Sequence, residues 1–269
     1  MRRLRLPLLL SCLPLAPALA ADPALTDPAP AKGWTVTLGA SAVYGPDYDG
    51  AKGRGFSAMP SFSISRADRA SRFSAPDDGM DFALYETERF SIGVVGDYKA
   101  GRYTKHDRRL VGLRDVPWSL EGGVFAEIWP VQDRLRARVE LRKGLRGHHG
   151  VVADFSADWV ETAGSFTFAL GPRLMLGSAS SMRSNYGVTA WESALNGLIP
   201  AYRPGGGMKS YGVAGSVEYA WNESWSTTVF ARYDRMAGDA ARSPLVRQIG
   251  DRNQFSLGVS TSYSFDIGG

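Results

Sequence analysis

The chain has 269 residues, with 31 lysines and arginines against 27 aspartates and glutamates and a formal net charge of +4. Three of the basic residues, Arg2, Arg3 and Arg5, open the chain, and without them 28 basic residues face 27 acidic ones. A charge so close to zero gives no reason to expect nucleic acid as a partner. The single cysteine, Cys12, excludes an internal disulfide and a cysteine metal site.

The first twenty residues have the composition of a secretory signal peptide. Their basic start precedes an apolar run over residues 6–15, and Ala18-Leu19-Ala20 supplies a small-residue cleavage site. The mature chain is therefore expected to begin at Ala21. Lipidation at Cys12 is the alternative, but the apolar run continues past this cysteine and favours simple cleavage.

Residues 21–33 form the next predicted unit. They contain Pro23, Pro28 and Pro30 and lack any periodic apolar pattern, which is typical of an extended leader. We expect this leader to lie in the periplasm and a single β-domain to occupy residues 34–269.

Strict alternation of side-chain type dominates the rest of the chain. In the last predicted strand, residues 255–267, every odd position is large or β-branched and every even position is Ser, Gly or Asp. Successive strand residues point to opposite faces, so one face suits an apolar medium and the other suits water. The strand exceeds the roughly 9–11 residues that a tilted strand needs to cross a bilayer.

Similar patterns predict strands along the whole domain. They cover residues 36–44, 56–64, 82–86, 90–98, 118–128, 135–141, 151–159, 166–176, 211–221, 225–235 and 255–267. Eleven strands conflict with the even number usual in single-chain bacterial barrels. A tight turn at residues 66–69 permits a twelfth short strand at residues 70–75, which restores the alternation of short and long links.

The expected fold is an all-β, up-and-down antiparallel transmembrane barrel of about twelve strands in the outer membrane. After the signal peptide no apolar run approaches the roughly 20 residues of a membrane helix, and only a closed barrel satisfies a sheet's hydrogen bonds in lipid. The alternative is a water-soluble all-β protein with its apolar faces turned inward.

The lengths of the links predict an orientation. Short links at residues 87–88, 131–133, 161–164 and 222–224 alternate with long links at residues 100–117, 145–150, 177–210 and 237–252. Short turns are periplasmic in such barrels, which places both termini in the periplasm. Trp129, Trp159, Trp221 and Trp225 fall beside the short links and are predicted to form an aromatic girdle in contact with outer-membrane lipid. Tyrosines and one tryptophan mark the opposite strand ends: Tyr44, Tyr98, Trp118, Tyr211 and Tyr233.

Charged residues gather on one face of three consecutive predicted strands. The central strand is mainly basic and its neighbours are acidic, so the charges can pair across the sheet. This predicted lumen ladder comprises Glu121, Glu127, Arg134, Arg136, Arg138, Glu140, Arg142, Asp154 and Asp158. It has two interpretations, a charge-selective pore lining or a salt-bridged interior that fills the barrel, and near-balanced charge favours the second.

The sequence gives no reason to expect an enzyme, a cofactor or a metal. His106, His148 and His149 lie in predicted outer loops, without the spacing of a catalytic triad or a hydrolase motif. Adjacent histidines such as His148 and His149 seldom converge on one ion without further ligands. We expect all three to be exposed loop residues.

Several segments resemble one family, the MipA/OmpV outer-membrane proteins, also called MltA-interacting proteins. The strongest resemblance is residues 233–246, with Tyr233, the Gly-Asp-Ala at residues 238–240 and the Ser-Pro at residues 243–244. Residues 44–48, Pro60, the His-Gly at residues 149–150, Tyr202 and residues 254–265 support it. The chain departs from the family pattern at Met236 and in continuing past Phe265.

The resemblance implies a non-enzymatic scaffold that holds a lytic transglycosylase together with a penicillin-binding murein synthase. Periplasmic links of a few residues offer little surface, so such contacts should use several turns and the leader at once. Two alternatives stay open: a porin-like channel, and a surface adhesin or stress- or osmolarity-related protein that uses the loop at residues 178–209.

Overall fold

The computed structural model describes residues 33–66 and 73–268. The predicted signal peptide, all of the predicted leader except Gly33, and residues 70–72 of the predicted twelfth strand lie outside these ranges. Within the described residues no helix is both long and apolar enough to cross a membrane.

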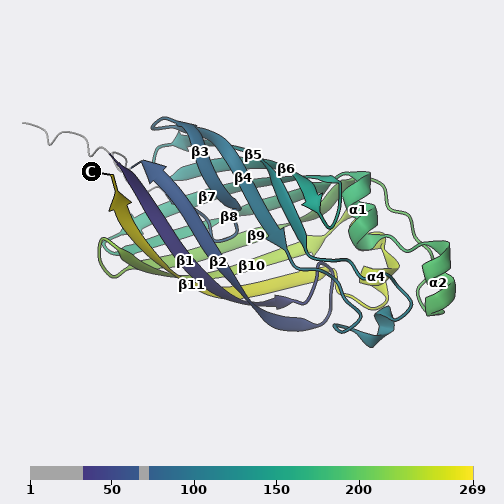
Figure 1. Ribbon diagram of the computed structural model, residues 1–269. Coiled ribbons are helices and arrows are strands. Elements are labelled where there is room, and N and C mark those ends of the chain that lie inside the picture. Colours follow the sequence, from purple (N-terminus) through teal and green to yellow (C-terminus); the bar gives the residue numbers. More distant parts are fainter. Residues whose placement is uncertain (1–32, 67–72, 269) are drawn as a thin grey trace, which may run out of the picture. The chain divides into compact units, whose positions relative to one another are not determined.

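In the described part of the chain, eleven strands form one closed barrel (Figure 1). They are β1 (Trp34–Pro46), β2 (Arg54–Arg66), β3 (Met80–Glu86), β4 (Phe90–Lys99), β5 (Ser119–Val131), β6 (Leu135–Arg146), β7 (Val151–Ala163), β8 (Phe166–Gly177), β9 (Gly207–Ala220), β10 (Trp225–Met236) and β11 (Asn253–Ile267). Each strand pairs with its neighbours in sequence, and β1 pairs with β11 to close the ring, Trp34 lying opposite Ile267. The predicted all-β transmembrane barrel is confirmed.

The alternation of residue types explains which face each strand buries. On β11, Leu257, Val259 and Tyr263 are exposed on the outer surface, whereas Gln254 and Gly258 on the other parity are buried inside. Large side chains that face outward would be costly in water, but in a bilayer they form the apolar belt of the barrel. At Gly258 the inward position has no room for a side chain, because Phe230 of the neighbouring strand lies across it and a Cβ would come within 2.3 Å of the ring.

The seam between β2 and β3 differs from the predicted arrangement. These strands run parallel and meet at the single pair Ile64 and Phe82, whereas all other neighbouring strands are antiparallel. Parallel neighbours need a long crossover connection. In the described part of that connection, residues 73–75 form no strand, and residues 73–79 contact side chains of the barrel interior. The predicted twelfth strand is therefore wrong at residues 73–75, and we call residues 73–79 the inner segment.

The two ends of the barrel differ in the length of their links. At one end, the short-turn end, tight turns join β3 to β4, β5 to β6, β7 to β8 and β9 to β10, and the described termini lie there. The other end, the loop end, carries α1 (Ala179–Tyr186), α2 (Ala190–Asn196), α3 (Gly238–Arg242), α4 (Pro244–Arg247) and the short 3-10 helix η1 (Arg108–Leu110). In Figure 1, α1, α2 and α4 lie beyond one end of the strands and the C-terminus lies at the other.

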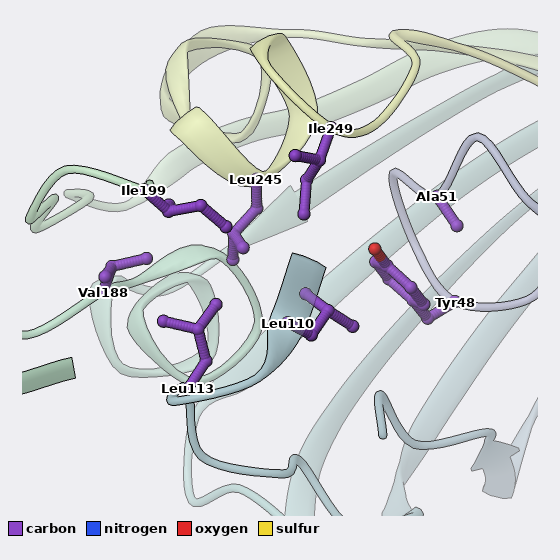
Figure 2. Packing of buried hydrophobic residues seen from close by; sticks show 8 residues of the cluster. All are labelled: Tyr48, Ala51, Leu110, Leu113, Val188, Ile199, Leu245 and Ile249. Atoms are coloured by element: carbon purple, nitrogen blue, oxygen red, sulfur yellow. The ribbon is translucent and has the colours of Figure 1, made fainter. Parts of the chain in front are cut away.

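The loops at the loop end pack on one another instead of standing apart. Four loops contribute to one buried apolar cluster, drawn in Figure 2: Tyr48, Ala51, Leu110, Leu113, Val188, Ile199, Leu245 and Ile249. A bridge between Ala51 and Gly250 joins the first loop to the last. A second cluster joins α1 to α3 and α4 through Met182, Tyr186, Met236, Ala240, Ala241 and Val246. The loops therefore form a folded cap.

Three of the four predicted girdle tryptophans lie on the outer surface at the short-turn end. The exposed fractions of Trp159, Trp221 and Trp225 are 49%, 65% and 46%. Trp129 is the exception, because it shares the inward parity of Glu127 and is buried at 4% exposure. Its indole N–H donates to Glu127 at 2.9 Å, and the girdle prediction for Trp129 is wrong.

Candidate functional site in the barrel interior

The charged interior is built around the inward-facing residues of β6. Arg136, Arg138, Glu140 and Arg142 occupy alternate positions, and all four are buried inside the barrel. A strand places such residues on one face about two positions apart, so four charged groups form one continuous row. Each charge in this row requires a partner, because an unpaired buried ion is strongly destabilising.

Arg136 is the most enclosed member of the row, with no exposed surface. Its Nε lies 2.8 Å from Glu127 on β5, and one terminal nitrogen lies 3.1 Å from Asp158 on β7. The other terminal nitrogen pairs with Asp78 of the inner segment. The guanidinium therefore joins two neighbouring strands to a chain segment inside the barrel.

Arg138 and Arg142 continue the network toward the loop end. Arg138 lies 2.6 Å from Asp81 and 2.9 Å from Glu140, and its guanidinium is 4.0 Å from the centre of the Phe125 ring. Arg142 contacts four carboxylates, at 3.1 Å from both Glu121 and Asp97 and also on Glu140 and Asp154. Each of these arginines thus neutralises carboxylates from more than one element.

The inner segment carries a second centre at Asp77. Both carboxylate oxygens accept hydrogen bonds from Arg173 on β8, at 2.8 and 3.0 Å. Arg232 on β10 donates to the same carboxylate at 2.6 Å and holds Asp234 with its remaining nitrogens. Arg173 also lies 2.8 Å from Asp158, which links this centre to Arg136. Bidentate pairs of this kind fix geometry as well as charge.

The structure brings together eight of the nine residues of the predicted lumen ladder. Arg134 is the residue left out, because it lies in the turn before β6 and pairs at 3.2 Å with Glu161 at the surface. Directly opposed charges occur at Glu127 with Arg138 and at Arg136 with Asp158.

Sequence reasoning missed the carboxylates outside the three charged strands. Asp77, Asp78 and Asp81 lie in or just after the link that was predicted to contain a strand. A signal was present, since Arg173 and Arg232 also have inward parity and need partners that their own neighbouring strands do not fully supply. The Pro76-Asp77-Asp78-Gly79 sequence is a turn pattern that carries two such carboxylates.

His148 is buried, contrary to the prediction of an exposed loop residue. Its Nε2 lies 2.8 Å from Glu121, and its Nδ1 accepts a hydrogen bond from the Gly150 backbone at 3.1 Å. His149 is exposed, and His106 is partly buried between the rings of Tyr48 and Tyr103. The described residues include no group of three or more potential metal ligands.

The interior has a second part that carries fewer charges. The inward positions of β11 from Ser256 to Ser264 are serines and glycine, unlike the arginines and carboxylates of β5 to β8. A cavity of about 170 Å³ lies between the inner segment and the wall formed mainly by β8, β9 and β10, and Ser256 is the residue of β11 that lines it. Phe73, Ala75, Ala214 and Phe230 line it, together with four charged residues, Asp77, Asp158, Arg173 and Arg232. The cavity therefore has mostly small or apolar walls and touches the charged network at these four residues.

The arrangement of the charged half suits closure better than transport. Every guanidinium in it already contacts two or more carboxylates, so a passing ion would have to displace an existing partner. Phe73 adds a steric contribution, packing against Trp129, Val160 and Ala169 at the inner wall.

Comparison with known proteins identifies a family that the chain matches. Residues 38–265 match the family model described as MltA-interacting protein MipA. No curated protein matches the chain. Among solved structures, an outer membrane channel from Pseudomonas putida F1 is similar, with 13% identity, a TM-score of 0.46, and coverage of 91% of this chain and 99% of that one. A Pseudomonas aeruginosa FadL homologue shows 12% identity, a TM-score of 0.35, and coverage of 86% and 89%.

Proposed function

The chain belongs to the MipA family of MltA-interacting proteins, and we propose that it is an outer-membrane scaffold for the enzymes that cut and build the murein wall. The proposed partners are a lytic transglycosylase and a penicillin-binding murein synthase. The observation that carries this proposal is the family match over nearly the whole barrel, because the description of that family names an interaction with a protein partner.

The occupied interior supports a scaffold role. Arg136 and Arg173 tie the inner segment to the wall through Asp77 and Asp78, and the loop end carries a folded cap. A scaffold needs a rigid, well-anchored surface and no passage through the membrane. Buried ion pairs that join distant elements provide such rigidity at little net gain in stability.

We propose that the short-turn end faces the periplasm. The paired ends of β1 and β11 lie at that end, and single-chain bacterial barrels have short periplasmic turns and longer outer loops. Trp159, Trp221 and Trp225 would then mark the periplasmic interface of the bilayer.

The proposed contact surface consists of several turns together. A standard interface buries roughly 800 Å² on each partner, which exceeds what one tight turn offers. The exposed residues Gln132 and Asp133 lie in one turn of the barrel rim, and exposed Thr162 and Gly164 lie at the end of β7 and in the adjacent turn. A partner that spans both turns could reach the required area with modest affinity.

Photo-crosslinking in living cells tests the role and the orientation together. Crosslinking side chains would be placed at Gln132 and Thr162, with exposed Ala194 in α2 as the loop-end control. We expect murein enzymes to be captured from the first two positions and not from Ala194. Capture from Ala194 alone would reverse the proposed orientation, and capture of no murein enzyme at any position would contradict the scaffold role.

A porin-like channel is the second candidate, favoured by the serine-rich wall of β11. A water-filled path along that wall would conduct ions in a planar bilayer. Conductance by the purified barrel, lost when Ser260 and Ser262 are replaced by leucine, would support the channel over the scaffold.

A further inference from the structure

A groove at the loop end lies apart from the barrel interior and from the turns of the proposed scaffold surface. It has a volume of about 600 Å³, within the range of small-molecule sites. Its walls come from α1, from the start of α2 and from residues 201–203. An inference from this groove is independent of the proposed scaffold function.

The floor of the groove is held rigidly. Val188 and Tyr202 form a two-residue bridge whose backbone hydrogen bonds measure 2.9 and 2.8 Å. The Tyr202 hydroxyl donates to the Asp239 carbonyl at 3.0 Å. At the wall, Thr189 and Glu192 form a capping box that fixes the first turn of α2. A ligand would therefore meet a largely preformed site.

The charge of the groove is one-sided. Arg114, Arg183 and Arg203 line it, and no aspartate or glutamate is among its lining residues. Arg114 lies 3.6 Å from Glu192, but within residues 33–66 and 73–268 neither Arg183 nor Arg203 forms an ion pair. Two guanidinium groups are thus free to bind an anion, in contrast to the arginines of the barrel interior.

The other lining groups indicate the chemistry of the uncharged part of the ligand. Ser180, Ser184 and Thr189 offer hydroxyl groups, while Val188 and Ala201 provide small apolar surface. This mixture matches a sugar ring, which has hydroxyls at its edge and C–H groups on its face. The volume also exceeds that of a single phosphate or carboxylate.

We propose that this groove binds an acidic saccharide that carries at least two phosphate or carboxylate groups. Arg183 and Arg203 would each hold one anionic group, because the planar guanidinium matches both phosphate and carboxylate in a two-point contact. The hydroxyl groups of the walls would contact the sugar. Since the site is open to solvent, binding should weaken as the salt concentration rises.

Binding would be measured by calorimetry on the purified barrel in lipid nanodiscs. The probes are glucose 1,6-bisphosphate and digalacturonate, with maltose as the neutral comparison and inorganic phosphate as the single anion. We expect both acidic probes to bind more tightly than inorganic phosphate, and maltose not to bind. Equal binding of maltose would overturn the proposal.

A matched pair of double variants tests the two arginines. R183Q/R203Q should weaken binding of both acidic probes about tenfold or more. R108Q/R247Q removes the same charge from exposed loop-end residues outside the groove and should leave binding unchanged. A similar loss in both variants, or no loss in R183Q/R203Q, would contradict a specific site. R203Q alone, at an exposed residue, gives a second measurement if the double variant folds poorly.

Nanodiscs with and without lipopolysaccharide separate the two sources of such a saccharide. Weaker probe binding in the presence of lipopolysaccharide identifies a membrane-anchored saccharide as the occupant. Unchanged binding identifies a soluble one.

Discussion

Asp77 of the inner segment and Arg173 of β8 form a two-point ion pair, with Nε–Oδ2 and Nη2–Oδ1 distances of 2.8 and 3.0 Å. The two residues are 96 positions apart in sequence, and no strand ladder joins their elements. The pair therefore anchors the inner segment to the wall. The pair also lines two neighbouring cavities of the interior.

Replacing Arg136 should destabilise the barrel strongly. Arg136→Met keeps an elongated side chain but leaves Glu127, Asp158 and Asp78 without their shared cation. Breaking a buried ion pair from one side costs about 3–5 kcal/mol. The measurement is the free energy of unfolding in urea with detergent micelles.

Arg134→Met is the matched control for this experiment. Arg134 pairs with Glu161 at the surface, where both side chains are about half exposed, and such a pair contributes roughly 0–1 kcal/mol. Equal losses in the two variants would show that the Arg136 network does not stabilise the barrel.

The Asp77 and Asp78 carboxylates should keep the inner segment inside the barrel. In a Cys12→Ser background, Ala75→Cys would introduce the only thiol of the chain at a position that is 4% exposed. We expect slow labelling by a charged maleimide, and severalfold faster labelling once Asp77→Ala and Asp78→Ala remove the contacts with Arg173, Arg232 and Arg136.

Ala163, the exposed last residue of β7, supplies the comparison for the labelling rates. Ala163→Cys should react quickly whether or not the two aspartates are present. If Ala75→Cys reacted as quickly as Ala163→Cys in the otherwise unchanged barrel, the inner segment would not be docked as described.

Brominated lipids should distinguish Trp129 from the outward-facing tryptophans. Bromine quenches indoles that contact the acyl chains, so Trp159→Phe should reduce the quenched fraction of the fluorescence. Trp129→Phe should increase that fraction, because it removes an emitter enclosed in the barrel. A decrease in the quenched fraction on replacing Trp129 would show that Trp129 contacts lipid, as the girdle prediction stated.

Acid should loosen the first turn of α2 through Glu192. Burial tends to raise the pKa of Glu192, but hydrogen bonds from Thr189 and Arg114 outweigh burial and hold this pKa below its usual value. The contribution of Glu192 to stability is therefore present above its unfolded-state pKa and is lost as the pH falls through its folded-state pKa. The loss should be about 1 kcal/mol, as for other helix caps.

Hydrogen-exchange protection of residues 190–196 measures this effect. Protection should fall between pH 7 and pH 3 in the unchanged protein. Glu192→Gln should flatten the dependence, since its amide does not titrate. An equal fall in the variant would assign the change to other groups.

The strand pattern, the membrane-spanning class and the basic row of β6 were predictable from sequence. Each depends on a period of two along one strand, which is a local property set by strand geometry. The same parity, applied to Glu127 and Trp129, would also have placed Trp129 inside. The girdle prediction for Trp129 used its nearness to a short link and not its alternation along the strand.

The inner segment, the cap and the partners of the arginines were decided by tertiary structure. The parallel contact of Ile64 with Phe82 and the pairing of Asp77 with Arg173 join residues whose local sequence is compatible with a turn or a short strand. The sequence indicates that the buried guanidinium groups need partners, but only closure of the barrel shows that Asp77 and Asp78 are among them. The sequence by itself determined which residues face inward, whereas the tertiary structure determined what those residues meet there, because burial imposes partners that no local period specifies.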